Sequence, residues 1–218
     1  MLAEGNAMER VQFITHRNER FSWIDSARIA LEGGCKWVQL RMKGVDKGLV
    51  EETAVKVKGL CLRYGALFII NDHVDICRHI KADGVHLGKG DMPVSEARSL
   101  LGNDYIIGAT ANTFDDVCQA VKSQADYIGC GPYRFTSTKE RLSPTLGLDG
   151  YRDILHNMRI HNIRIPLYAI GGLTSDDVVP LLTNGIHGIA LSSYILNAPD
   201  PVETMRQIIL TTNNALLP

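Results

Sequence analysis

KWVQLRMKGVDKGLVEETAVKVKGLCLRYGALFII, residues 36–70, reads as one strand–helix–strand unit, and the fold of the whole chain follows from it. Residues 36–40 are typical of a strand, and residues 47–64 have the amphipathic pattern of a long helix that stops at Gly65. Residues 67–70 are wholly apolar, as expected of a strand that is buried on both faces of a parallel sheet. A helix between two strands with short connections predicts parallel pairing through a crossover.

The same alternation extends in both directions along the chain. Strands are expected at residues 11–15, 36–40, 67–70, 84–87, 105–108, 127–129, 165–170 and 186–191. Helices are expected at residues 23–32, 47–64, 73–80, 93–101, 113–122, 148–157, 174–184 and 201–210. Eight such units predict an α/β fold, a single-domain TIM (β/α)₈ barrel over residues 11–218. A doubly wound open sheet is the alternative, although no GxGxxG motif follows the first strand.

Composition narrows the class of protein. The chain has 218 residues, is 45% hydrophobic and carries a net charge of -1, which favours one sizeable core and gives no support for nucleic-acid binding. No apolar run approaches the roughly 20 residues that span a bilayer, so no membrane association is expected. Residues 1–10 are expected to be a flexible tail, with Met8 as an alternative start and no signal-peptide core. The odd set of five cysteines lacks a CxxC pair, which favours reduced thiols in a cytoplasmic protein over structural zinc. A homo-oligomer is compatible with the sequence.

In a barrel the chemistry lies where strands end and βα loops begin. After the second strand, alternation places Gln39, Arg41 and Lys43 on one side and Leu40 and Met42 on the other. If the first side faces inward, an amide and two cations enter the mouth of the barrel together. A solvated strand end is the alternative, but a barrel strand has no solvated face.

Carboxylates follow the third and fourth strands. Asn71 and Asp72 end the third strand, and Asp91 lies in the loop after the fourth. Because neighbouring strands end side by side, the two carboxylates can approach each other, which fits a hard cation such as Mg²⁺. The alternative for Asp72 is a helix N-cap. His86 lies within a strand and is interpreted as a core histidine.

Small and hydroxyl-bearing residues follow the fifth, seventh and eighth strands. Thr110, Gly171, Gly172, Ser192 and Ser193 stand at these positions. A glycine pair lets backbone N–H groups approach phosphate oxygens, and the loops after strands seven and eight commonly hold phosphate in such barrels. A tight turn is the alternative for the glycines, but it does not explain the serines.

The loop after the sixth strand, within residues 126–147, adds three hydroxyls and a cation: Thr136, Ser137, Thr138 and Lys139. These groups suit an anionic ligand, and an ordinary solvated loop is the alternative. Together, the strand ends predict two anion sites and one divalent-cation site around one mouth, which pairs a diphosphate with a monophosphate.

These motifs resemble the thiamine phosphate synthase family along nearly the whole chain and in the same order. The matching segments are QLRMK at 39–43, IND at 70–72, DGVHLGKGD at 83–91, IGAT at 107–110, GPYRFTSTK at 131–139, AIGG at 169–172 and ALSSYI at 190–195. The resemblance implies a TIM-barrel transferase. Its expected reaction joins 4-amino-2-methyl-5-hydroxymethylpyrimidine diphosphate to 4-methyl-5-(2-phosphoethyl)thiazole, gives thiamine phosphate and releases diphosphate by a dissociative, Mg²⁺-assisted mechanism.

The resemblance also implies roles for individual residues. It assigns the pyrimidine diphosphate to Gln39, Leu40, Arg41, Met42, Lys43, Asn71, Thr110 and Lys139, with catalytic roles for Arg41, Lys43 and Lys139. It assigns the thiazole phosphate to Thr136, Ser137, Thr138, Gly172, Ser192 and Ser193. It assigns Mg²⁺ to Asp72 and Asp91.

Two departures and two rival functions accompany this resemblance. Thr110 stands where the family often has serine, and residues 133–135 replace its usual Val-Phe-Pro. A thiazole tautomerase is a paralogous barrel, but its characteristic histidine is Asn112 here. A non-catalytic binder of thiamine phosphate is the other alternative, and it has no need of the metal carboxylates.

Overall fold

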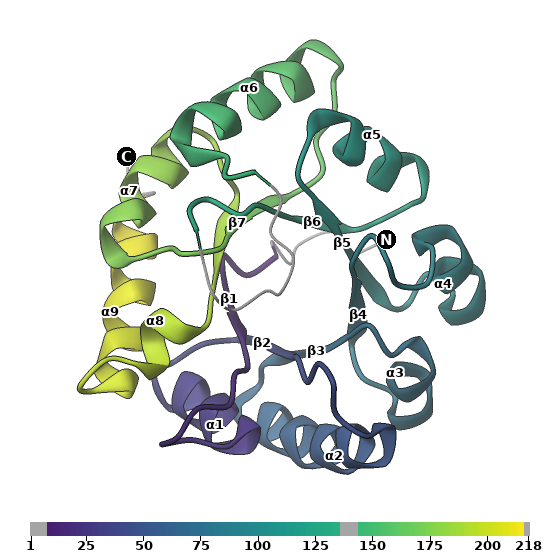
Figure 1. Ribbon diagram of the computed structural model, residues 1–218, viewed down its shortest axis with the longest axis vertical. Helices are drawn as coiled ribbons and strands as arrows, with labels where there is room; N and C mark the ends of the chain where they lie inside the picture. Colours follow the sequence, from purple (N-terminus) through teal and green to yellow (C-terminus); the bar gives the residue numbers. More distant parts are fainter. Residues whose placement is uncertain (1–7, 136–143, 216–218) are drawn as a thin grey trace.

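A computed structural model describes residues 8–135 and 144–215, and it is a closed barrel of eight parallel strands inside a ring of helices (Figure 1). The strands are β1 (Val11–Ile14), β2 (Trp37–Leu40), β3 (Leu67–Asn71), β4 (Gly84–Leu87), β5 (Ile106–Ala111), β6 (Tyr127–Cys130), β7 (Leu167–Ile170) and β8 (Gly188–Leu191). Each strand pairs with its neighbours in sequence, and β1 closes the barrel on β8 through Val11 and Ile189. The predicted TIM barrel is therefore confirmed, and the doubly wound sheet is excluded.

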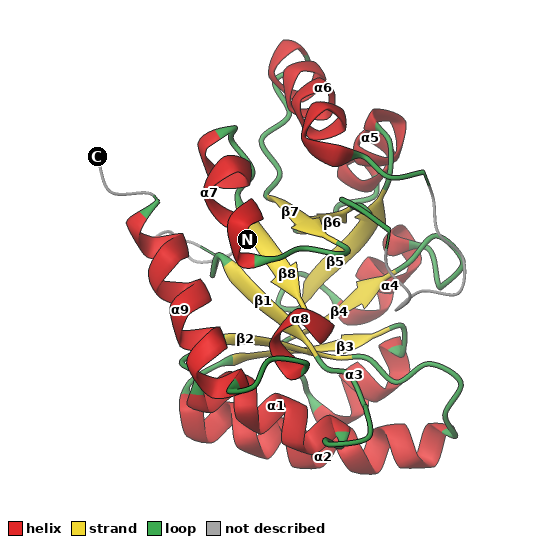
Figure 2. Ribbon diagram, turned by 60° about the vertical axis from the view of Figure 1, so that its left-hand side comes forward, coloured by secondary structure: helices red, strands yellow, loops and turns green. Residues whose placement is uncertain are grey.

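The helices cover the outside of this barrel (Figure 2). They are α1 (Trp23–Glu32), α2 (Lys47–Tyr64), α3 (Val74–Ile80), α4 (Val94–Leu101), α5 (Phe114–Lys122), α6 (Gly147–Ile160), α7 (Ser175–Thr183), α8 (Ser193–Leu196) and α9 (Pro201–Asn214). Local sequence sets several of the ends. Thr113 begins α5 with a capping box, and Gly65 ends α2 in the left-handed conformation with φ of 59°. Among the helices described, none is long and apolar enough to cross a membrane.

The largest differences from the prediction lie in two helices near the C-terminus. The short helix α8 was not predicted, because a single turn is too short to show a helical period. Helix α9 continues to Asn214, four residues past the expected end at residue 210, because Met205, Ile208 and Thr212 keep one buried stripe facing the barrel.

The hydrophobic core has two parts. One lies between the strands and the surrounding helices, and the other fills the inside of the barrel near the N-terminal ends of the strands. In the inner part, Trp37 makes edge contacts with Tyr127 and Tyr168, at ring-centroid distances of 4.8 and 4.9 Å. All three rings are fully buried. This aromatic layer fills the barrel near the N-terminal ends of its strands, below the C-terminal mouth.

The packed chain begins earlier than predicted. Residues 1–7 lie outside the described residues, but Met8 is buried and belongs to the inner core. The carbonyl of Glu9 accepts a hydrogen bond from Tyr168 at 2.7 Å, and that of Arg10 accepts one from the Ile189 N–H at 2.8 Å. Residues 8–10 are therefore part of the barrel floor rather than of a tail.

The five cysteines, Cys35, Cys61, Cys77, Cys118 and Cys130, are all free thiols. Burial raises the pKa of Cys35 to about 12, so this thiol stays protonated and packs as a small apolar side chain.

Candidate active site

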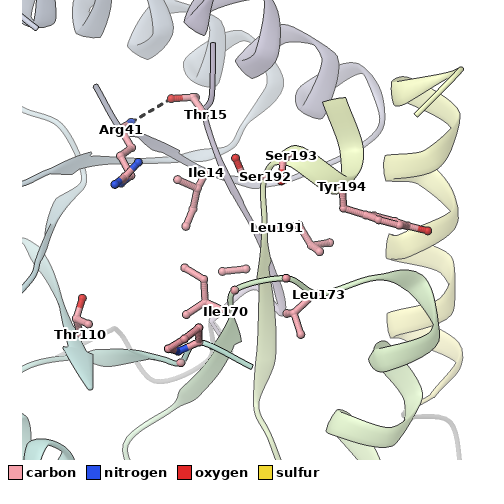
Figure 3. Close-up of a pocket in the computed structure, with 15 residues that line it drawn as sticks. Ile14, Thr15, Arg41, Thr110, Ile170, Leu173, Leu191, Ser192, Ser193 and Tyr194 are labelled. Atoms are coloured by element: carbon pink, nitrogen blue, oxygen red, sulfur yellow. Dashed lines mark hydrogen bonds between the residues drawn. The ribbon is translucent and has the colours of Figure 1, made fainter. Parts of the chain in front are cut away.

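Two adjoining cavities open at the C-terminal end of the barrel, and they share Ile14, Arg41, Thr110 and Ile170. One extends over the ends of β7 and β8 and is lined by Gly131, Pro132, Gly171, Gly172, Leu173, Ala190, Leu191, Ser192, Ser193, Tyr194 and Thr15. The other extends over the ends of β2, β3 and β4 and is lined by Gln12, Gln39, Lys43, Asn71, Asp72, His86, Gly88, Asp91 and Gly129. We call them the glycine–serine cavity and the carboxylate cavity. Figure 3 shows Arg41 and Thr110 across the glycine–serine cavity from Ser192 and Ser193.

The predicted alternation along β2 is observed. Gln39, Arg41 and Lys43 all line the carboxylate cavity. Leu40 and Met42 point the other way and are buried in the outer core between the sheet and the helices. Their side chains therefore lie away from the cavities, so a ligand would meet only the backbone at these two positions.

The two carboxylates predicted at neighbouring strand ends converge on one cation. Lys43 Nζ forms an ion pair with Asp72 Oδ2 and lies 3.7 Å from Asp91 Oδ1. The other oxygen of Asp91 accepts the Gly88 N–H at 2.7 Å. Burial, followed by the contact with Asp91, raises the pKa of Asp72 to about 6. Burial also acts to raise the pKa of Asp91, but the contact with Asp72 and the Gly88 N–H outweigh it, so that pKa is lowered.

The backbone at Asp72 is held in an unusual conformation. Its φ is 70°, and the His73 N–H donates to the Asn71 carbonyl at 2.9 Å, which makes Asp72 the centre of a three-residue turn. Positive φ is costly for a residue with a side chain, and such positions cluster at functional sites. The N-cap of α3 is His73, with no side-chain cap bond, so the alternative interpretation of Asp72 as a helix cap is wrong.

The glycine–serine cavity has features that suit a phosphate. Gly171 and Gly172 have φ values of 97° and 68°, and they lead into the N-terminus of α7. Ser192 Oγ is buried and has no hydrogen-bond partner within the described residues. A buried hydroxyl without a partner is uncommon in a folded protein and fits one that donates to a ligand. Ser192 and Gly172 are therefore brought together as predicted.

Residues 133–135, which depart from the family pattern, are hydrogen-bonded to the turn that lines this cavity. The Tyr133 and Arg134 N–H groups donate to the carbonyls of Ile170 and Gly171, at 2.9 and 3.1 Å. The Arg134 guanidinium donates to both carboxylate oxygens of Asp177, at 2.5 and 2.8 Å, and to the Gly172 carbonyl at 2.8 Å. The segment is thus tied to the turn after β7, which sequence reasoning did not predict.

Four predicted site residues, Thr136, Ser137, Thr138 and Lys139, lie outside the described residues. Sequence reasoning also missed several polar residues that belong to the site or contact it, among them Gln12, Thr15 and Tyr127. It interpreted His86 as a core residue and did not predict its contact with the cavity. Thr15 Oγ1 accepts the Arg41 N–H at 3.0 Å (Figure 3). His86 is buried as expected, but its ring bonds to Thr110 Oγ1 at 3.0 Å and lines the carboxylate cavity. A polar residue at an inward position of an apolar strand is the signal that marks Gln12 and His86.

Known proteins match this chain over most of its length, including the barrel and its mouth. Residues 11–195 match the sequence model of a family described as thiamine monophosphate synthase. A relative from Phocaeicola vulgatus named thiamine-phosphate synthase is 57% identical over 199 residues, which cover 91% of this chain and 96% of the relative. A Bacteroides fragilis relative of the same name is 52% identical over 202 residues, covering 93% of this chain and 99% of the relative. The solved structure of thiamine phosphate pyrophosphorylase from Pyrococcus furiosus superposes with a TM-score of 0.83 at 31% identity, covering 95% of this chain and 97% of that one.

Proposed function

Because the chain belongs to the thiamine monophosphate synthase family, we propose that this enzyme joins 4-amino-2-methyl-5-hydroxymethylpyrimidine diphosphate to 4-methyl-5-(2-phosphoethyl)thiazole and releases diphosphate. The observation that carries the proposal is the pair of adjoining cavities, each suited to a different anion, that share Arg41 and Thr110. A reaction between two phosphorylated molecules needs two anion sites that meet, and two cavities that share part of their lining support this proposal.

The diphosphate belongs in the carboxylate cavity. Arg41 and Lys43 supply positive charge there, and Asp72 and Asp91 are close enough together to contact one ammonium group. Two carboxylates around a cation match the preference of Mg²⁺ for a few hard oxygen ligands with phosphate oxygens completing its shell. Asp72 and Asp91 would hold this ion, which when bound supplies positive charge next to the diphosphate.

The thiazole phosphate belongs in the glycine–serine cavity. The Ser192 hydroxyl, which has no partner among the residues that the structure describes, and the backbone turn at Gly171 and Gly172 suit a dianion. The N-terminus of α7 adds a favourable dipole. Thr136, Ser137 and Thr138 are proposed as further partners of the same phosphate.

The proposed chemistry is dissociative. The bond between the pyrimidine methylene carbon and the diphosphate oxygen breaks, and its electron pair leaves with the diphosphate. The thiazole nitrogen then donates its lone pair to the pyrimidine-methyl cation and forms the new carbon–nitrogen bond. Arg41 and Lys43, with Lys139 as a third proposed cation, favour this step because negative charge grows on the diphosphate as the first bond lengthens.

The tautomerase alternative finds no support at its diagnostic position. The Asn112 side chain donates to the Gly131 carbonyl, so it ties the loop after β5 to the end of β6. An amide with this role provides no proton-transferring group in place of a histidine.

The test is formation of thiamine phosphate from both substrates, with Mg²⁺ and with excess chelator. We expect turnover that requires the metal, and we expect Asp72→Asn to reduce it strongly. Asp75→Asn is the matched control, because Asp75 also pairs with a lysine, Lys47, but lies exposed and outside both cavities. Full activity in chelator would exclude the metal role, and binding of thiamine phosphate without turnover would favour the non-catalytic alternative.

A further inference from the structure

Five polar side chains from five strands form one continuous hydrogen-bonded row inside the barrel, between the aromatic layer and the mouth. Gln39 Nε2 donates to Gln12 Oε1 at 3.4 Å, and Gln12 Nε2 donates to the Tyr127 hydroxyl at 3.2 Å. The same hydroxyl lies 3.0 Å from His86 Nδ1, and His86 Nε2 lies 3.0 Å from Thr110 Oγ1. Gln12, Gln39 and Tyr127 are each at most 2% exposed. Their polar groups therefore form hydrogen bonds with one another instead of with bulk water.

The donors and acceptors of the row run in one direction. The Tyr127 hydroxyl accepts an N–H from Gln12, which leaves its single proton for His86 Nδ1. Burial raises the pKa of Tyr127, so the hydroxyl keeps that proton. A histidine that accepts at Nδ1 is the tautomer with its proton on Nε2, and it therefore donates to Thr110 Oγ1.

The direction of the row decides what Thr110 offers to a ligand. Its oxygen already accepts from His86, so its own O–H is left to donate. Thr110 lines both cavities, which places that donor where the two substrates meet. At the other end Gln39 directs its amide nitrogen into the barrel, which leaves its carbonyl oxygen as an acceptor.

We propose that Gln12, Tyr127 and His86 are positioning residues that fix the Thr110 hydroxyl as a hydrogen-bond donor to a ring nitrogen of the pyrimidine substrate. This inference rests on the proposed function, which supplies an aminopyrimidine as the ligand. An aminopyrimidine has ring nitrogens that only accept and an exocyclic amine that donates, which matches a donor at Thr110 and an acceptor at Gln39. A row of the opposite direction would offer an acceptor at Thr110 and would disfavour the same ring.

The glycines next to the row make room for it. A side chain at Gly129 would begin 3.0 Å from His86 Cε1, and one at Gly108 would begin 2.1 Å from Tyr127 Cζ. The backbone therefore approaches both rings closely on one side, and a side chain at either glycine would displace the ring beside it.

The central test compares Tyr127→Phe with Tyr168→Phe. Both remove one buried hydroxyl from the same aromatic layer, but the Tyr168 hydroxyl donates to the Glu9 carbonyl and is outside the row. We expect Tyr127→Phe to raise the KM for the pyrimidine diphosphate about tenfold, since Thr110 loses its fixed direction and Gln12 its partner. The KM for the thiazole phosphate should stay within about twofold, and Tyr168→Phe should move neither constant by more than that.

Rescue at His86 separates positioning from packing. In His86→Gln the amide can accept from Tyr127 and donate to Thr110, so most of the affinity for the pyrimidine diphosphate should return. His86→Leu fills a similar volume without polar atoms and should behave as Tyr127→Phe does. Equal losses in the two His86 variants would mean that the ring only packs.

A substrate analogue tests the direction of the row. For the parent enzyme, we expect an analogue with one ring nitrogen replaced by C–H to have a KM about tenfold higher than that of the natural substrate. For Tyr127→Phe, the KM of the analogue should exceed that of the natural substrate by less than about twofold. The same penalty in both enzymes, or Tyr127→Phe indistinguishable from Tyr168→Phe, would overturn the inference while the proposed function stands. No turnover by the parent enzyme with the natural substrates would overturn the proposed function, and with it the ligand assigned to Thr110.

Discussion

Gly172→Ala should destabilise the protein more than its backbone conformation alone requires. Gly172 has φ of 68°, and a Cβ added to it would lie 2.5 Å from Arg134 Cγ and 2.9 Å from the Phe135 carbonyl oxygen. The positive φ costs an alanine about 1–2 kcal/mol. Overpacking adds about 1–3 kcal/mol, because the Arg134 N–H and guanidinium hold that segment against the turn. The expected total is about 2–5 kcal/mol.

Gly65→Ala is the matched control for this substitution. Gly65 has φ of 59° with nothing within 4 Å of an added Cβ, so it should cost only the backbone part, about 1–2 kcal/mol. Urea unfolding gives both free energies if the slopes are unchanged. The same Gly172→Ala protein should show a larger rise in KM for the thiazole phosphate than for the pyrimidine diphosphate. The reasoning is refuted if Gly172→Ala costs no more than Gly65→Ala, and the site is misassigned if both KM values rise equally.

Three further predictions concern other parts of the barrel. Arg98 is 8% exposed and donates to Asp126 and to three backbone carbonyls. Arg98→Met should therefore lower the free energy of unfolding by about 3 kcal/mol, because it leaves these buried groups without their partner. A loss below about 1 kcal/mol in urea unfolding would contradict this. Because the pKa of Asp72 is raised from 3.8 to about 6, the folded protein holds a proton that the unfolded chain has lost between these values. The free energy of unfolding of the metal-free protein should therefore fall as pH rises through this window, and Asp72→Asn should show no such fall. Lys139→Ala should lower the single-turnover rate about a hundredfold with a smaller change in affinity, and Lys139→Arg should recover part of it; a rate within about twofold of the parent would make Lys139 a solvated loop lysine.

The sequence was sufficient to predict features that depend on local rules. A strand has a period of two, so Gln39 and Arg41 could be placed inside the barrel and Leu40 outside it without knowledge of any neighbour. The equivalent ends of parallel strands meet at one edge, so Asp72 and Asp91 could be brought together from their positions after two consecutive strands.

What the sequence did not show depends on pairing between distant strands. Residue 134 could be identified as a departure from the family pattern, but its partner Asp177 lies 43 residues further on and is reached only because β6 lies next to β7. The register also pairs Gly108 with Tyr127 and Gly188 with Tyr168, so each large ring lies over a glycine of the adjacent strand. Nothing local to Gly108 indicates that its missing side chain is space for Tyr127.

The inside of the barrel has an apolar layer below and a polar row above, and Tyr127 belongs to both. Its ring packs against Trp37 and Tyr168, and its hydroxyl joins Gln12 to His86. A phenylalanine would complete the apolar layer equally well, so packing alone does not account for tyrosine at this position. The buried hydroxyl is tolerated because it has hydrogen-bond partners on both sides, Gln12 and His86, since an unpaired buried polar group costs more than a paired one contributes. The role of tyrosine here is therefore best understood from the row above it, whose last member is the Thr110 hydroxyl at the mouth.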